Sequence, residues 1–195
     1  MTKRFKLIKI FIALSMVCNV IVFDTALASN TNASTEYLTI DFNSSSYTYP
    51  ATITTTVISQ NDYSKNIKRE VEIELKFDDN FEIINPNSKI SGYDPSYSCF
   101  ATLVTNYTQY NDSTIKIYSV EGTRTVNDST VKVYSQHVHI EYNGIDGNYK
   151  RDYYPNKDTK SWNIPISFPS VYMNGVIYGS KYTIELGRNS SARTW

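Results

Sequence analysis

The chain has 195 residues, and its 19 basic and 19 acidic side chains give a formal net charge of +0. This balance excludes the strongly basic surface that is typical of nucleic-acid-binding proteins. The chain has only 2 cysteines, too few for a disulfide framework, so its stability has to come from a buried core. Its length suits one such core and therefore one domain.

The first 28 residues have the pattern of a secretory signal peptide. Basic residues at positions 3, 4, 6 and 9 precede an apolar run over residues 10–23, and Ala26-Leu27-Ala28 is a small-residue cleavage site. A transmembrane anchor is the alternative, but the run is shorter than the roughly 20 apolar residues that a spanning helix needs. We predict cleavage after Ala28 and a secreted, extracellular protein, with lipidation of Cys18 as a minor alternative.

After cleavage, we expect a flexible segment over residues 29–35 and one domain over residues 36–195, with no transmembrane segment in the mature chain. Cleavage would leave Cys99 as the one cysteine, which cannot form an internal disulfide. The surrounding residues, Tyr97-Ser98-Cys99-Phe100-Ala101, are typical of a core strand. We therefore expect the Cys99 thiol to be buried.

Apolar residues recur with a period of two, which is typical of β-strands. Over residues 70–77 every odd position is apolar and every even position is charged, as expected of a strand with one face in the core and the other in water. Asn174-Gly175, between two short apolar runs, predicts a type I′ hairpin. Similar alternating runs, separated by clusters of turn-forming residues, cover residues 37–42, 53–59, 99–107, 162–168 and 181–186.

Many short strands without a helical pattern predict an all-β fold, namely a single antiparallel β-sandwich that is immunoglobulin-like or jelly-roll-like. Within it, one segment occurs twice: residues 111–119, NDSTIKIYS, return as residues 127–135, NDSTVKVYS. Two copies are too few for a solenoid, which needs at least three stacked units. We interpret them as a local duplication, or a chance similarity of strand pattern, within one sheet.

The alternation changes phase in the strand that follows the second copy. Val131 and Val133 are apolar at odd positions, whereas Val138, Ile140 and Tyr142 are apolar at even positions. A regular strand cannot bury both sets on one side. We predict a bulge, a bend or a change of sheet near Ser135-Gln136, which would bury both sets.

The strongest candidate for metal chemistry is His137-Val138-His139-Ile140-Glu141, which places the chain's 2 histidines and a carboxylate on one face of one strand. Imidazole and carboxylate groups are ligands of zinc and similar transition metals. Along an extended strand the three side chains spread over about 13 Å, so one ion needs a further ligand from elsewhere. The alternative interpretation is a solvated polar face.

Other chemistry has weaker support in the sequence. Asp146-Gly147-Asn148 with Asp152 offers oxygen ligands for calcium, although the same residues suit a tight turn. Neither Cys99 nor any serine lies in a recognisable nucleophile motif. We therefore expect a protein that is not an enzyme and has no cofactor, with a transition metal or calcium as the alternative.

Tyrosine is enriched, with 17 tyrosines against 2 tryptophans. Tyrosine offers a rigid contact surface with a polar tip, which suits recognition of protein or glycan, but it also favours strands. The densest group follows a glycine-rich turn in a segment that we interpret as a loop. We predict a ligand-binding surface made of Tyr149, Lys150, Arg151, Tyr153 and Tyr154.

These features favour a secreted, non-enzymatic module that binds or adheres to an extracellular glycan or protein. A bias toward Asn, Ile, Lys and Tyr suits a bacterial source. A β-pore-forming toxin or membrane-active oligomer is one alternative, because residues 51–60 and 114–142 alternate and are rich in Ser and Thr; charged residues and the phase change interrupt that pattern. A metal-binding protein or metalloenzyme using His137 and His139 is the other.

Overall fold

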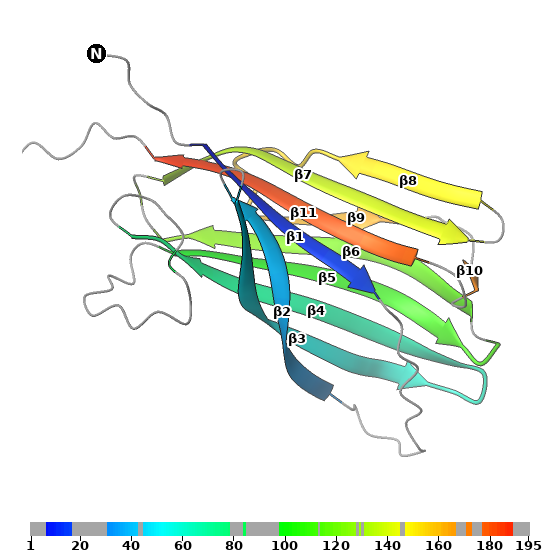
Figure 1. Ribbon diagram of the computed structural model, residues 1–195. Helices are drawn as coiled ribbons and strands as arrows, with labels where there is room; N and C mark the ends of the chain where they lie inside the picture. The colour runs from blue at the N-terminus through cyan, green and yellow to red at the C-terminus, as the bar shows by residue number, and fades with distance from the viewer. Residues whose placement is uncertain are drawn as a thin grey trace, which may run out of the picture.

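The computed structural model shows an all-β protein with antiparallel sheets arranged as a two-layer, sandwich-like fold (Figure 1). Among the residues that it describes, every element of regular secondary structure is a β-strand. No helix in this part of the chain is long and apolar enough to cross a membrane. The described residues are 7–16, 31–42, 45–78, 84, 98–112, 114–127, 129, 131–144, 147–166, 171–172 and 177–188.

The smaller sheet has four strands in the order β1-β11-β7-β8. Their bounds are Leu7–Met16 for β1, Ile177–Arg188 for β11, Val131–Gly144 for β7 and Gly147–Tyr153 for β8. The strand β1 lies within the predicted signal peptide and forms one edge by pairing with β11. The strand β8 forms the other edge and pairs with β7.

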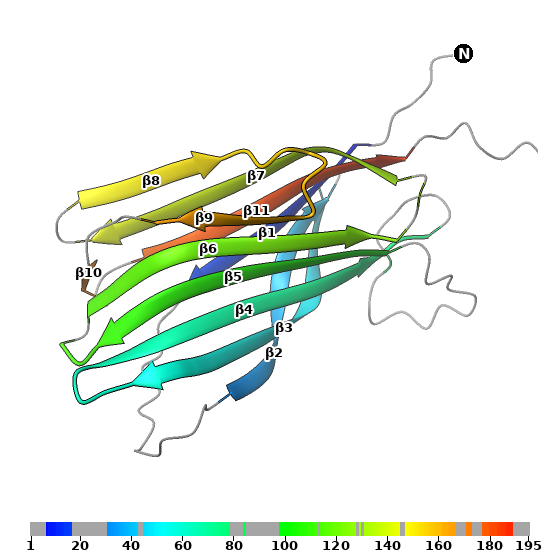
Figure 2. The same ribbon diagram turned by 180° about the vertical axis from the view of Figure 1, so that it is seen from behind.

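The larger sheet has the order β10-β6-β5-β4-β3-β2, and β9 also pairs with β6. Figure 2 shows the chain passing from β8 in the smaller sheet to β9 in the larger one. The strands of this sheet are β2 (Thr31–Phe42), β3 (Ser45–Gln60), β4 (Ser64–Lys76), β5 (Ser98–Tyr110), β6 (Thr114–Val126), β9 (Ser161–Pro165) and β10 (Val171–Tyr172).

The core lies between the two sheets. In β4, the residues Val71, Ile73 and Leu75 are fully buried, while the charged residues between them are more exposed, as the alternation predicts. Facing side chains come from β7 and β11, and they include the buried Ile140 and Tyr182. Cys99 is 1% exposed, so the prediction that its thiol is buried is confirmed.

A β-bulge in β7 confirms the predicted change of phase. Ser135 pairs with Glu185 and Val133 pairs with Leu186, so Tyr134 has no partner residue in β11. Because the bulge absorbs Tyr134, Gln136, Val138 and Ile140 face the core, where each is at most 2% exposed. The earlier valines, 131 and 133, pack against the same core and are half-buried. The side chain of residue 142 lies outside the described set.

Two predictions about strand pairing are wrong. The repeated segments begin β6 and β7, which belong to different sheets, because the second copy crosses to the opposite layer. The expected hairpin does not form between the segments flanking Asn174-Gly175: β10 pairs with β6, whereas both edges of β11 are occupied by β1 and β7. The turn residues themselves lie outside the described residues.

The start of the predicted mature chain is extended rather than irregular where it is described. Residues 31–35, within the segment expected to be flexible, form the first part of β2 and pair with residues 52–56 of β3. Their side chains are exposed, so backbone pairing rather than side-chain burial holds this part of the strand.

Candidate functional site

The candidate site lies on the outer face of the hairpin formed by β7 and β8. Val138 points into the core and is fully buried, so its neighbours His137 and His139 point away from the core. Asp152 of β8 lies directly opposite His139. Because residues directly opposite in an antiparallel pair share one face of the sheet, the pairing brings a carboxylate to the two histidines.

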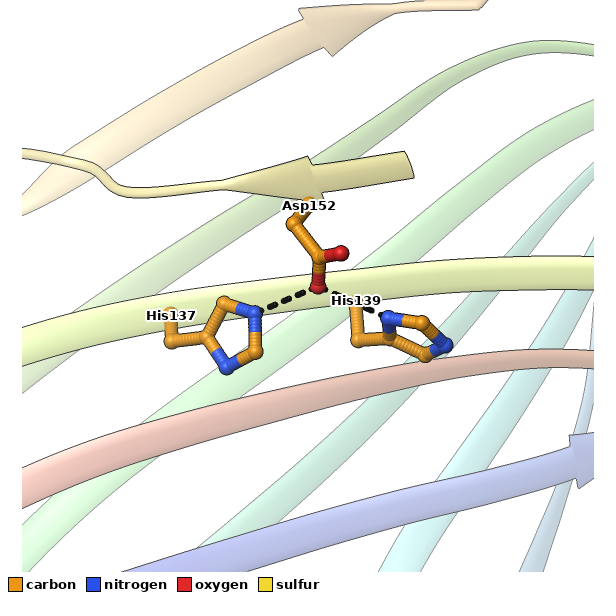
Figure 3. A group of neighbouring side chains, drawn as sticks. All are labelled: His137, His139 and Asp152. Carbon is orange, nitrogen blue, oxygen red and sulfur yellow. Dashed lines mark hydrogen bonds and ion pairs between the residues drawn. The ribbon is translucent and has the colours of Figure 1, made fainter. Parts of the chain in front are cut away.

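One carboxylate oxygen accepts hydrogen bonds from both imidazoles. Nε2 of His137 lies 2.7 Å and Nδ1 of His139 lies 2.8 Å from Oδ1 of Asp152. Figure 3 shows this oxygen between the two rings, with the carboxylate reaching over β7 from the neighbouring strand. One nitrogen of each histidine and one oxygen of the aspartate lie within 4.8 Å of one another. The three side chains therefore converge on a small volume.

A second carboxylate contacts the far side of the His139 ring. Oε2 of Glu141 is 3.4 Å from Nε2 of His139, and Nζ of Lys150 is 3.2 Å from the same oxygen. The hydrogen bond from Lys150, together with that from His139, lowers the pKa of Glu141. Glu141 thus contacts a different nitrogen from the one that faces Asp152, and it lies outside the convergent group.

The hydrogen bonds shift the protonation of the central pair. The hydrogen bond that His139 donates to Asp152 is the main cause that raises the pKa of His139, with a smaller contribution from the bond to Glu141. The bonds from His139 and His137 lower the pKa of Asp152. Without a metal, the geometry therefore favours a charged His139 imidazolium between two carboxylates.

An exposed aromatic ring covers one side of the cluster. The ring of Tyr154 is stacked on that of His137, with 4.8 Å between centroids and an interplanar angle of 10°. Tyr154 is 73% exposed, so its other face is open to solvent. This stacking restricts the rotation of the His137 ring and places a flat apolar surface beside polar ligands.

The predicted tyrosine surface is divided by the strand that contains it. Residues 147–153 form β8, so the interpretation of this segment as a loop is wrong. Tyr149 and Tyr153 are half-buried and pack against the core. Lys150 and Tyr154 lie with the histidines, and Arg151 is exposed opposite a buried isoleucine. The five residues therefore do not form one continuous surface.

Asp152 is the member of the convergent group that the single-strand pattern misses. Gly144 and Gly147 are paired, and this register places position 139 opposite position 152; the two glycines are the signal that could have fixed it. The calcium prediction used Asp152 as well. The other acidic residue of the predicted calcium group, Asp146, lies outside the described residues. Asp152 is directed toward the imidazole nitrogens of the two histidines instead.

Comparisons with protein families, with curated proteins and with solved structures find no match to this chain. Its function is therefore inferred from the residues and geometry of the site.

Proposed function

We propose that the protein is an exported, non-enzymatic β-sandwich, immunoglobulin-like or jelly-roll-like in class, that binds a divalent transition metal through His137, His139 and Asp152. The observation that supports this most strongly is the convergence of two nitrogens and one oxygen, from two paired strands, within 4.8 Å. Two imidazoles and a carboxylate form a donor set that zinc accepts. Cleavage after residue 28 would remove β1 and leave β11 at the edge of the smaller sheet.

The movements needed to accept an ion are small. Zinc binds nitrogen and oxygen ligands at about 2.0–2.2 Å, so neighbouring ligand atoms of a tetrahedral site lie roughly 3.3 Å apart. The two hydrogen-bonded contacts, now 2.7 and 2.8 Å, have to widen by roughly half an ångström. The longest distance between ligand atoms of the group, which is within 4.8 Å, has to shorten. Rotation about the side-chain torsions on an outer sheet face can produce these changes in distance without a change in backbone pairing.

Glu141 and Lys150 support the site from its rim. When Glu141 accepts the Nε2–H of His139, the neutral ring has its lone pair on Nδ1, the nitrogen directed at Asp152. A carboxylate in this position fixes the tautomer and orientation of a metal-binding histidine. The three protein ligands leave a fourth tetrahedral position for water or for a donor from another molecule.

A glycan- or protein-binding module is the second candidate, and Tyr154 favours it. An exposed aromatic face beside hydrogen-bonding groups is suited to the apolar face of a sugar or to a peptide side chain. The ring is 73% exposed and is held against His137 by stacking. Tyr154→Ala should abolish binding to an extracellular glycan or protein if this surface is used, and unchanged binding would exclude it.

Calorimetric titration with zinc, after removal of bound metal with EDTA, tests the metal proposal. We expect binding of one ion per chain, its loss in His139→Ala and Asp152→Asn, and a weakening of about tenfold in Glu141→Gln. Glu74→Gln is a matched control, because Glu74 is an exposed carboxylate on β4 in the other sheet. Absence of binding in the wild-type protein, or equal binding by the folded Asp152→Asn variant, would contradict the proposal.

A further inference from the structure

A positively charged hollow opens where β6 ends and β7 begins. It has a volume of about 450 Å³, and the segment that links β8 to β9 forms one of its walls. Three valines form its apolar part. Its charged lining consists of Arg124, Lys132, Lys157, Lys160 and Asp158, which is four cations against one carboxylate.

Arg124 is the residue that distinguishes this hollow from a patch of surface lysines. It is 7% exposed, and its Nε atom is buried without a hydrogen-bond partner. None of the ion pairs between described residues includes Arg124. A buried charge normally has a partner, because desolvation of an ion costs several kcal/mol. Among the described residues, Arg124 thus has no carboxylate partner for its charge, and its Nε donor is unused.

The same arginine holds the wall of the hollow in place. Its guanidinium donates to the carbonyl oxygen of Lys157, and its backbone N–H donates to that of Lys160 at 2.9 Å. From the opposite sheet, Nε2 of Gln136 donates to the carbonyl oxygens of Asn156 and Thr159 at 2.7 and 2.9 Å. The two lysines therefore extend from a backbone that is fixed by both sheets.

We propose that this hollow binds a tetrahedral oxyanion, namely a sulfate or phosphate group, with Arg124 as its buried anchor. A guanidinium and nearby ammonium groups form charge-assisted hydrogen bonds with such oxygens. The volume exceeds what the anion alone needs and falls within the range of small-molecule sites, so part of the molecule that carries the group fits beside the valines. This site is separate from the metal centre and does not depend on it.

Isothermal titration at constant ionic strength, with sodium sulfate, inorganic phosphate and a sulfated disaccharide as probes and sodium chloride as the reference, tests the inference. We expect sulfate or phosphate to bind where chloride does not. Tighter binding of the disaccharide would identify an ester as the source, and equal or weaker binding would identify the free ion. No binding of any of the three probes beyond the effect of chloride would overturn the proposal.

Substitutions locate the site. Lys132→Gln and Lys160→Gln should each weaken binding by about two- to fivefold, Arg124→Gln by about tenfold or more, and Asp158→Asn should strengthen it. Lys68→Gln is the control, since this lysine of β4 pairs with Glu70 outside the hollow. If Arg124→Gln does not fold, the variants of the two exposed lysines, Lys132→Gln and Lys160→Gln, still test the proposal. Equal affinity in both lysine variants and the control would overturn the proposal.

Discussion

Trp162 occupies the space that a side chain on Gly122 would need: a Cβ atom built on Gly122 would lie 2.2 Å from Cζ2 of Trp162. The two residues are direct partners in the ladder between β6 and β9. The tryptophan ring also makes an edge contact with Tyr182 of the opposite sheet, with 5.1 Å between ring centroids. The absence of a side chain at position 122 thus allows Trp162 to connect the two layers.

Gly122→Ala should therefore destabilise the protein. The new methyl group has to displace a bulky ring that is packed on both sides, and overpacking of this kind costs about 1–3 kcal/mol. Urea denaturation measures the change in the free energy of unfolding. Thr125→Ala, at an exposed position of the same strand, is the control and should have little effect. Equal stability of the two variants would contradict this account of the packing.

The pair of Asp152 and His139 should stabilise the metal-free fold only in a limited pH range. The lowered pKa of Asp152 contributes stability above the ordinary value of 3.8, which is lost as the pH falls through the folded-state pKa. The raised pKa of His139 contributes stability below the ordinary value of 6.5, which is lost as the pH rises through the folded-state pKa. The two contributions overlap between these ordinary values.

Comparison of Asp152→Asn with the wild-type protein, both in EDTA, measures this effect. The difference in the free energy of unfolding should be largest near about pH 5.5 and should become smaller as the pH rises through the folded-state pKa of His139. A difference that stays constant over this range would show that the two residues are not coupled as the geometry indicates.

The Cys99 thiol should be unreactive in the folded protein. Burial raises its pKa to about 12, an effect that the positive charge of Arg124 only partly offsets. The nucleophilic thiolate is therefore scarce in the folded state. A thiol reagent at about pH 8 should modify the protein in urea and leave it unmodified in buffer. Because the unfolded thiol ionises near its ordinary value of 9.0, stability should also fall as the pH rises above that value. Rapid modification in buffer would contradict the burial.

The fold class could be predicted because local patterns determine it. The alternation over residues 70–77 fixes which side chains of β4 enter the core, and the phase change after Val133 requires a bulge wherever the strand pairs. Which strands become neighbours is not local information. The two copies of the repeat have nearly the same sequence, yet β6 and β7 lie in different sheets, because packing between layers decides their placement.

The candidate site could be predicted only in part for the same reason. Alternation along one strand places His137 and His139 on one face, but the contribution of Asp152 depends on the register of the β7–β8 hairpin. That register also turns Tyr149 and Tyr153 toward the core. The local sequence does not predict the burial of Arg124, because that burial depends on a wall of the hollow that is formed by residues more than thirty positions away.

The bulge at Tyr134 leads to the last prediction, on deletion of this residue. Deletion would bring Val133 next to Ser135, so a strictly alternating strand would place Val131, Val133 and Val138 on the same face without a bulge. Both apolar sets would therefore stay packed against the core. The deletion should change the free energy of unfolding by much less than the several kcal/mol that exposure of either set would cost.

Deletion of Glu72 from β4 provides the matched control. This strand pairs with β5 without a bulge, so the deletion would put the fully buried Val71 and Ile73 on opposite faces and should cost about 1.5 kcal/mol or more for each side chain exposed. Urea denaturation of the two deletion variants, followed by tryptophan fluorescence, gives the comparison. If deletion of Tyr134 were as harmful as deletion of Glu72, the bulge would not be what brings the two apolar sets of β7 onto one face.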